Sequence, residues 1–294
     1  MVFASVVLEI GLAVLAMLVT ATLVIVGPRQ LVRAVRDFRW RLEGIALPTT
    51  VLLCVLFLRW ATQDVAQTIS TQVTGVAITD YLFGIDRALF GETPVVFLQS
   101  IQMDELTSYF VFVYIYGYAF LLAFPFVAYF ALREMDDLST LILAYTANYG
   151  IGLLCYFVFI AYGPRNVDPT LFDGLLYTAF PESGFLTHSI NHNTNVFPSL
   201  HTSMAMTVFF LAVHTREKYP LWVPLSGVLA GSVALSTMYL GIHWFSDVIA
   251  GTFLALVSVY IGRNYTVEGL VRTARVFFST KFKDAQTRFE GDRE

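Results

Sequence analysis

Two short segments contain the side chains best suited to chemistry. The first, VFPSLHTSMA, carries Ser199 and His201, and the second, YLGIHWFSDVIAG, carries His243 and Asp247. A carboxylate four residues after a histidine lies beside the imidazole when both are on one helix. There it can fix the tautomer of the ring and raise its basicity, as in other His–acid pairs. The spacing therefore predicts a reactive histidine at residue 243.

The two histidines are spaced so that they finish at the same depth in a membrane. From His201 the chain makes one apolar crossing, turns through TREKYP and returns by a second apolar crossing to His243, 42 residues later. At a rise of about 1.5 Å per residue, each crossing takes about 20 residues. Both imidazoles are therefore expected at one face of the bilayer. Ser199, after Pro198, would cap a helix there, and the N–H groups of that helix N-terminus can bind an anion.

The composition indicates a membrane protein. Hydrophobic residues make up 56% of the 294 residues and charged residues 14%, with a mean hydropathy of +0.66. Soluble domains contain about 45–50% and about 25% of these classes. A disordered chain lacks this much apolar surface. The net charge is −4 without long runs of one sign, which argues against a nucleic-acid partner.

Metal and cofactor chemistry has little support in the sequence. Cys54 and Cys155 lie inside apolar runs, so neither a disulfide framework nor a thiolate metal site is expected. His188 and His192 are spaced i, i+4, but Glu182 is the only acidic residue near them. We interpret the pair as polar loop residues and expect no metal and no other cofactor.

Seven apolar stretches come close to or exceed the about 20 residues that cross a hydrocarbon core. They are residues 4–27, 44–61, 106–132, 138–162, 197–214, 221–242 and 244–262. The first is interpreted as a retained span, because no basic segment precedes it and five arginines follow it. The expected fold is all-α, a polytopic integral membrane bundle of about seven transmembrane helices. Its parts are an N-terminal span with a basic loop (1–43), a six-span core (44–262) and a basic tail (263–294).

Basic residues predict the orientation, because Lys and Arg accumulate in cytoplasmic loops. When the seven spans alternate, one set of loops holds 15 of the 18 basic residues and the other set holds Arg59, Arg87 and Arg165. This asymmetry predicts a multi-pass protein of the cell membrane with its N-terminus outside and its C-terminus in the cytoplasm. Both histidines are then on the extracytoplasmic face.

One region between the expected spans is too polar to cross. It covers residues 63–105 and contains DYLFGIDRALFG, whose apolar side chains are typical of a short helix lying at the membrane surface. This helix would carry Arg87.

The two histidine segments closely resemble motifs of the type 2 phosphatidic acid phosphatase superfamily. FPSLH has the Pro-Ser-x-His pattern of its second motif, and HWFSD has the His-x3-Asp that ends its third. The sequence FPSLH followed by STMYLGIHWFSD is most similar to the inositol phosphorylceramide synthase branch, whose members are inositolphosphotransferases. The resemblance implies metal-independent phosphoryl transfer through a phosphohistidine. In that scheme His243 attacks phosphorus, Asp247 orients it, and His201 protonates the departing alcohol and then activates water or an acceptor alcohol.

Two phosphate-binding cations of that superfamily are missing here. Its first motif is Lys-x6-Arg-Pro, whereas IAYGPRN has Arg165 with Val158 at the Lys position and Asn166 at the Pro position. Its third motif opens Ser-Arg, and Thr237 stands at that Arg position. Transferring phosphoryl groups need fixed positive donors, so another group should compensate.

The basic side chains expected on the outer side are the candidates for this compensation. Arg165 is the first, because it lies on the loop leading to His201, and Arg87 is the second. Arg59 is interpreted as a residue that snorkels to the interface.

Together these features predict a membrane enzyme that acts on a lipid phosphate or phospholipid in the bilayer. The missing cations and the STMYL sequence favour transfer of a phosphorylated headgroup between lipids. The alternative is a lipid-phosphate or polyprenyl-phosphate phosphatase. A transporter is disfavoured because the polar groups cluster at one edge rather than at the midplane. A retinal protein is disfavoured because no span contains a lysine. The donor headgroup, the acceptor and the oligomeric state stay open.

Overall fold

The described chain is a bundle of long helices that lie along one axis. The computed structural model describes residues 2–69, 72, 75–181, 196–273 and 275. The long helices are α1 (Val2–Ala21), α3 (Phe38–Ile69), α8 (Asp136–Val158), α13 (Trp222–Tyr239) and α14 (Phe245–Asn264), together with α6 (Asp104–Phe112) and α7 (Tyr118–Phe130). A π-helical turn, η3 (Val113–Gly117), joins α6 to α7, and a second one, η1 (Thr22–Val26), extends α1. This all-α membrane bundle confirms the predicted fold class.

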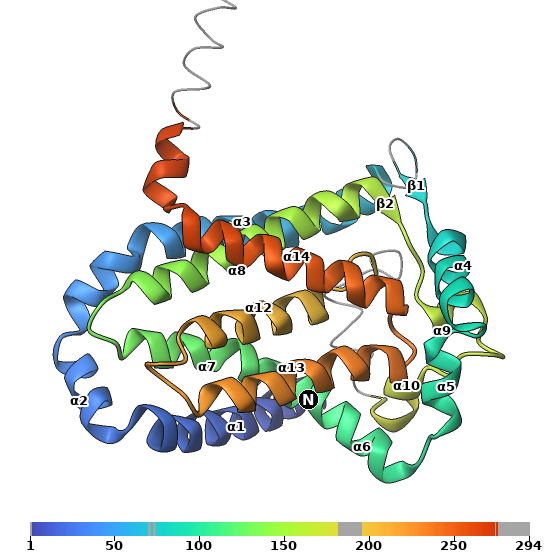
Figure 1. Ribbon diagram of the computed structural model, residues 1–294, viewed down its shortest axis with the longest axis horizontal. Coiled ribbons are helices and arrows are strands. Elements are labelled where there is room, and N and C mark those ends of the chain that lie inside the picture. The colour runs from blue at the N-terminus through green and yellow to red at the C-terminus, as the bar shows by residue number, and fades with distance from the viewer. Residues whose placement is uncertain (1, 70–71, 73–74, 182–195, 274, 276–294) are drawn as a thin grey trace, which may run out of the picture.

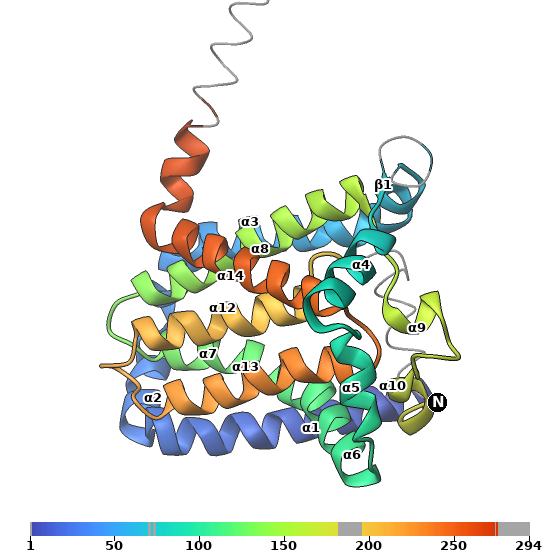
Figure 2. The same cartoon turned by 45° about the vertical axis from the view of Figure 1, so that its right-hand side comes forward.

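Short elements close the two ends of the bundle (Figures 1 and 2). At one end, α2 (Pro28–Arg36) turns the chain from α1 into α3. At the other end lie α4 (Thr79–Phe90), α5 (Pro94–Ser100), α9 (Pro164–Val167) and α10 (Leu175–Ala179). Two-residue strands, β1 (Val76–Ala77) and β2 (Phe159–Ile160), pair in parallel and tie this end together.

Six of the seven predicted spans are long and apolar enough to cross a membrane. The remaining one, the fifth along the chain, was predicted over 197–214. It is the shorter helix α12 (Leu200–His214), which has 15 residues. It packs against α7, α8, α13 and α14. Because α12 packs against four other helices and the residues before it are buried in protein, it can be shorter than the hydrocarbon thickness.

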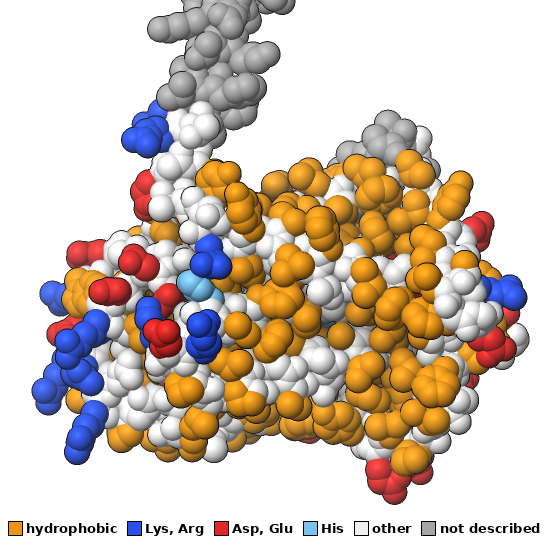
Figure 3. All heavy atoms as spheres, in the orientation of Figure 1, with side chains coloured by type: hydrophobic (Ala, Val, Ile, Leu, Met, Phe, Trp, Pro, Cys, Tyr) orange, Lys and Arg blue, Asp and Glu red, His pale blue; other side chains and the backbone are white. Residues whose placement is uncertain are grey.

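The bundle has a packed centre and a lipid-like exterior. The main core cluster includes Phe124, Leu141, Val208 and Trp222, all buried, from α7, α8, α12 and α13. On the face shown in Figure 3, apolar side chains cover most of the length of the bundle, whereas Lys and Arg gather at the α2 end. This distribution is what a bilayer requires of a spanning protein.

The short helix expected in DYLFGIDRALFG is α4, which lies across the end of the bundle opposite α2 (Figure 2). Tyr81, Leu89 and Phe90 are exposed on its outer side. Leu82 and Asp86 are buried on its inner side, against the bundle. The helix is therefore a cap over the histidine end as well as an amphipathic surface segment.

Candidate active site

The N-terminus of α12 is fixed to the start of α14. Ser199 is the N-cap of α12, and its hydroxyl accepts a hydrogen bond from the Thr202 backbone N–H at 3.3 Å. The Ser199 backbone N–H donates to the Asp247 carbonyl at 3.2 Å. A serine in this position replaces a hydrogen bond that the first helical turn lacks. The two motif segments are thus held together by the backbone itself.

A tight turn between α13 and α14 presents His243. The backbone N–H groups of Ile242 and His243 both donate to the Thr237 carbonyl, at 2.9 and 3.0 Å. Gly241 has a φ of 72°, and a Cβ there would lie 2.3 Å from the Asp173 carbonyl oxygen. Only glycine suits this conformation and this close approach. The turn therefore depends on the LGIH sequence.

His243 and Asp247 form a buried pair. The His243 Nδ1 lies 3.4 Å from the Asp247 Oδ2, and the two residues are 4% and 0% exposed. The same oxygen accepts a hydrogen bond from the Trp244 backbone N–H at 2.9 Å. In the described part of the chain, Asp247 Oδ1 has no hydrogen-bond partner. The carboxylate is therefore fixed beside the ring and leaves His243 Nε2 as the other reactive nitrogen.

Burial determines the protonation state of His243. Loss of water lowers the pKa of its imidazole to about 3, the nearby Arg165 cation adds to the decrease, and a hydrogen bond to the Val196 backbone opposes it. The ring is therefore neutral at pH 7. A neutral imidazole has the lone pair that a nucleophile or base needs.

His201 faces His243 from the first turn of α12. Its ring packs against those of Tyr114 and Tyr118, with centroid distances of 4.6 and 4.7 Å. The centroids of the two histidine rings are 6.4 Å apart. Groups at this separation can each approach to about 3 Å of one reacting atom placed between them. The structure thus brings together the two histidines that the spacing predicts to meet.

Arg165 lies beside this pair. Its backbone N–H donates to the Gly241 carbonyl at 3.2 Å, and a Cβ on Gly163 would lie 2.2 Å from the Ile242 carbonyl oxygen. The α9 loop therefore sits directly on the turn that carries His243. The guanidinium donates to the Tyr177 hydroxyl at 3.0 Å. Among the described carboxylates, none is within ion-pair distance of it.

Comparison with known proteins identifies the family of this arrangement. A family model described as the PAP2 superfamily matches residues 80–261, more than half of the chain. The chain belongs to the PAP2 superfamily. No curated protein and no solved structure gave a match. Membership in the PAP2 superfamily, together with the apolar helices, makes the protein a phosphatase- or phosphotransferase-type lipid enzyme of a membrane.

The structure separates the three arginines that were expected on this side of the PAP2 bundle. Arg87, the second candidate for phosphate binding, is exposed on α4 with its guanidinium carbon 5.5 Å from the Phe83 ring centroid. No contact among the described residues joins it to either histidine. Arg59 instead points toward α8.

Arg59 lies on α3, outside the PAP2 match, and contacts the aromatic wall behind His201. Its guanidinium carbon is 5.4 Å from the Tyr149 ring centroid and 5.8 Å from that of Tyr156. Tyr149 lies near Tyr118, whose ring packs on His201. The interpretation of Arg59 as a snorkelling interface residue missed this direction. A cation inside an apolar span is by itself a signal for function.

Asp86 on α4 is a second residue that the spacing argument missed. Its carboxylate accepts hydrogen bonds from the backbone N–H groups of Phe245 and Ser246, at 2.8 and 3.0 Å. Burial raises the pKa of Asp86, and these hydrogen bonds oppose the increase. Asp86 thus caps the N-terminus of α14, which begins at Phe245, two residues before Asp247. An acid surrounded by apolar residues in YLFGIDRALF was the available signal.

Metal-ligand groups are a separate question. No group of three His, Cys, Asp or Glu side chains that could hold a metal occurs in the described ranges. His188 and His192 lie outside the described residues.

Proposed function

We propose that the protein transfers a phosphorylated headgroup from a lipid-linked phosphoester through a phosphohistidine at His243. The observation that carries the proposal is the pair of facing imidazoles with ring centroids 6.4 Å apart, of which His243 is buried beside a fixed carboxylate. A lone His–Asp contact could be structural. Two facing histidines at the entrance of two helices, in a PAP2 chain, support a covalent route.

The first half-reaction forms an N–P bond and breaks a P–O bond. The Nε2 lone pair of neutral His243 attacks phosphorus, and Asp247 holds Nδ1 and stabilises the positive charge that develops on the ring. His201, as imidazolium, gives its proton to the departing alkoxide. The bound phosphate anion favours that imidazolium form. The products are a phosphohistidine ester and a free alcohol.

The second half-reaction reverses these roles. Neutral His201 takes the proton of an acceptor hydroxyl, whose oxygen attacks phosphorus while the N–P bond breaks. His243 returns to its neutral form and His201 to its imidazolium form, so the cycle closes. An acceptor alcohol gives transfer, and water gives hydrolysis.

Phosphate binding is assigned to three parts of the site. Arg165 supplies a planar fork without a carboxylate partner in the described chain. Ser199 and the N–H groups of the first turn of α12 supply neutral donors. Arg59 adds a cation behind His201, on the side where the usual Lys of the first motif is absent. Arg87 is a weaker, outer contact to the lipid headgroup.

Transfer to a lipid hydroxyl, as in the inositolphosphotransferase branch, is supported by Val158 and Thr237 at two cation positions of the PAP2 motifs. Hydrolysis of a lipid phosphate is the second candidate, favoured by the PAP2 match itself. We place the reaction at the extracytoplasmic face, because the histidine end carries few of the basic residues.

The acceptor decides between these two reactions. Purified enzyme in vesicles is given a panel of phospholipid and lipid-phosphate donors, with and without candidate acceptor alcohols, and the products are identified by mass spectrometry. Transfer predicts a new phosphodiester that forms only with the acceptor present. Release of the phosphorylated headgroup or phosphate at an unchanged rate, with no new phosphodiester, contradicts transfer and supports hydrolysis.

A further inference from the structure

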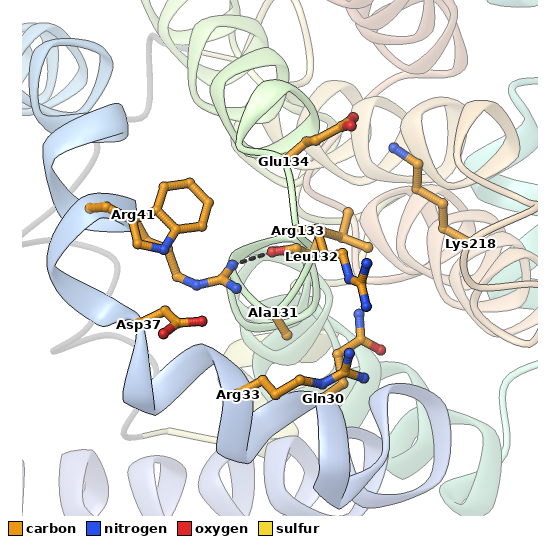
Figure 4. A pocket seen from close by; sticks show the side chains of 10 residues that line it. Gln30, Arg33, Asp37, Arg41, Ala131, Leu132, Arg133, Glu134 and Lys218 are labelled. Carbon is orange, nitrogen blue, oxygen red and sulfur yellow. Dashed lines mark hydrogen bonds between the residues drawn. The ribbon is translucent and has the colours of Figure 1, made fainter.

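A polar cavity lies at the opposite end of the bundle from the histidines. Its volume is about 720 Å³, and it is formed by α2, the start of α3 and the loops after α7 and α12 (Figure 4). Its charged lining is Arg33, Asp37, Arg41, Arg133, Glu134 and Lys218. His201 begins α12, whereas Lys218 follows its end, and 15 helical residues correspond to about 22 Å. This cavity is therefore separate from the reaction site.

Arg41 is the built element of this cavity. It is 3% exposed, and its Nη1 donates to the Phe130 carbonyl at 2.7 Å and to the Leu132 carbonyl. Its guanidinium carbon is 4.7 Å from the Trp40 ring centroid. These contacts fix the group at the C-terminal end of α7, where a cation is favoured.

One donor of this fixed guanidinium is left without an acceptor. Among the described residues, the buried Arg41 Nε has no hydrogen-bond partner. Asp37 lines the same cavity, but no ion pair joins it to Arg41. A buried, unpaired charged donor is costly. An anion in the cavity that Arg41 lines would offset this unpaired charge.

The lining as a whole, Arg41 included, has an excess of positive charge. Arg33 comes from α2 and Arg133 from the loop after α7 (Figure 4). Lys218 is paired with Asp137, which is outside the lining. Three arginines then remain against Asp37 and Glu134. Arginine forks are suited to phosphate oxygens, which they bind in pairs.

The level of the cavity identifies the source of the phosphate. The apolar spans of α3 and α8 begin at Phe38 and Asp136, next to the lining residues. Trp40 is 44% exposed at the rim, and such aromatic residues favour the headgroup level of a bilayer. Basic pockets between spanning helices at this level bind anionic lipid headgroups.

We propose that this cavity binds the phosphate of an anionic phospholipid from the leaflet opposite the histidine pair. The lipid joins the start of α3 to the loop after α7 and so stabilises the attachment of α2 and α3. This attachment matters because most side chains of the α3 span face outward.

The test uses the full chain, purified in a neutral detergent. Bound lipids are counted by native mass spectrometry, and the midpoint of thermal unfolding is measured. Phosphatidylglycerol is the probe, phosphatidylcholine is the zwitterionic control, and glycerol 3-phosphate is the free-phosphate arm. We expect phosphatidylglycerol to bind saturably with one high-affinity site and to raise the midpoint, whereas the other two probes do neither at equal concentration.

Variants locate the binding. Arg33→Ala and Arg133→Ala should each weaken phosphatidylglycerol about tenfold, which corresponds to one charge-assisted contact. Arg36→Ala on the same helix α2, outside the lining, is the matched control and should bind normally. Arg165→Ala, at the histidine end, should also bind normally. Arg41→Ala is less decisive because Arg41 holds two carbonyls, so the two exposed arginines carry the test.

Three outcomes would overturn the proposal. Equal binding of phosphatidylcholine would show that charge plays no part. Equal stabilisation by glycerol 3-phosphate would assign the cavity to a soluble phosphate rather than a lipid. Loss of binding in Arg165→Ala, with normal binding in Arg33→Ala and Arg133→Ala, would place the lipid at the reaction site.

Discussion

Removing the Arg165 guanidinium should slow turnover by at least about 10²-fold. Loss of a single oxyanion donor costs about 10²–10³ in turnover in well-studied enzymes. Arg165 should contribute more of the positive charge that stabilises the phosphoryl group here, because Val158 and Thr237 replace two cations of the PAP2 motifs. Its backbone is bonded to the turn that carries His243. We therefore expect Arg165→Ala to fall in or above that range.

The conservative variant separates charge from shape. Arg165→Lys keeps a cation but loses the planar fork that holds two phosphate oxygens. It should recover only part of the activity. Full recovery would mean that a point charge near His243 is sufficient.

Arg59 and Arg87 serve as graded comparisons. A unit charge about 10 Å from a phosphoryl group contributes about 1–2 kcal/mol at an effective dielectric constant of about 20, which is about tenfold in rate. Arg59, held on the tyrosines behind His201, should show a loss of this size in Arg59→Ala. Exposed Arg87 is the matched control, and Arg87→Ala should lose less.

The assay is the initial rate at saturating donor for each variant, normalised to folded protein by size-exclusion profile and thermal midpoint. The reasoning is refuted if Arg165→Ala runs near the wild-type rate while Arg87→Ala is inactive. Phosphate recognition would then lie on α4 rather than on the α9 loop.

Three further predictions concern stability, protonation and topology. Asp86→Ala leaves two partly buried N–H groups at the start of α14 without their acceptor. It should lower unfolding stability by about 1–3 kcal/mol, and an unchanged thermal midpoint would contradict this. In the unfolded chain His243 gains a proton below about pH 6.5. In the folded protein the pKa of the buried ring is about 3, so it stays neutral well below that pH. Acidification from pH 7.5 to 5 should therefore cost the wild type about 2 kcal/mol more stability than His243→Gln, and equal pH dependence in the two proteins would refute neutral burial. In a background without native cysteines, a membrane-impermeant thiol reagent added outside should label Asn166→Cys and spare Glu217→Cys; the reverse pattern would invert the orientation.

Local spacing was enough to predict the centre of the site. The i, i+4 relation of His243 and Asp247 needs only the start of one helix, and the facing position of His201 needs only two crossings of similar length. Both follow from helix geometry. The all-α bundle followed equally well from the apolar stretches, except that α12 is shorter than a free-standing span because neighbouring helices enclose it.

Residues supplied by distant elements could not be predicted in this way. Asp86 reaches the start of α14 from α4, 159 positions earlier than Phe245. Arg59 reaches the tyrosines of α8 from α3. Neither contact leaves a periodic signal in the chain, because it depends on which face of one helix packs on another. Each was visible only as a charged residue in an apolar setting.

Direct detection of a phosphohistidine at residue 243 tests the central claim. Wild-type enzyme and His201→Ala are mixed with a donor without acceptor, quenched under alkaline conditions and digested, and the peptides are analysed by mass spectrometry. We predict a phosphoryl-headgroup adduct on His243 in the wild type, slower formation and slower breakdown of the same adduct in His201→Ala, and no adduct or turnover in His243→Ala. Turnover by purified His243→Ala at an ordinary rate, or an adduct on a different residue, would contradict the account.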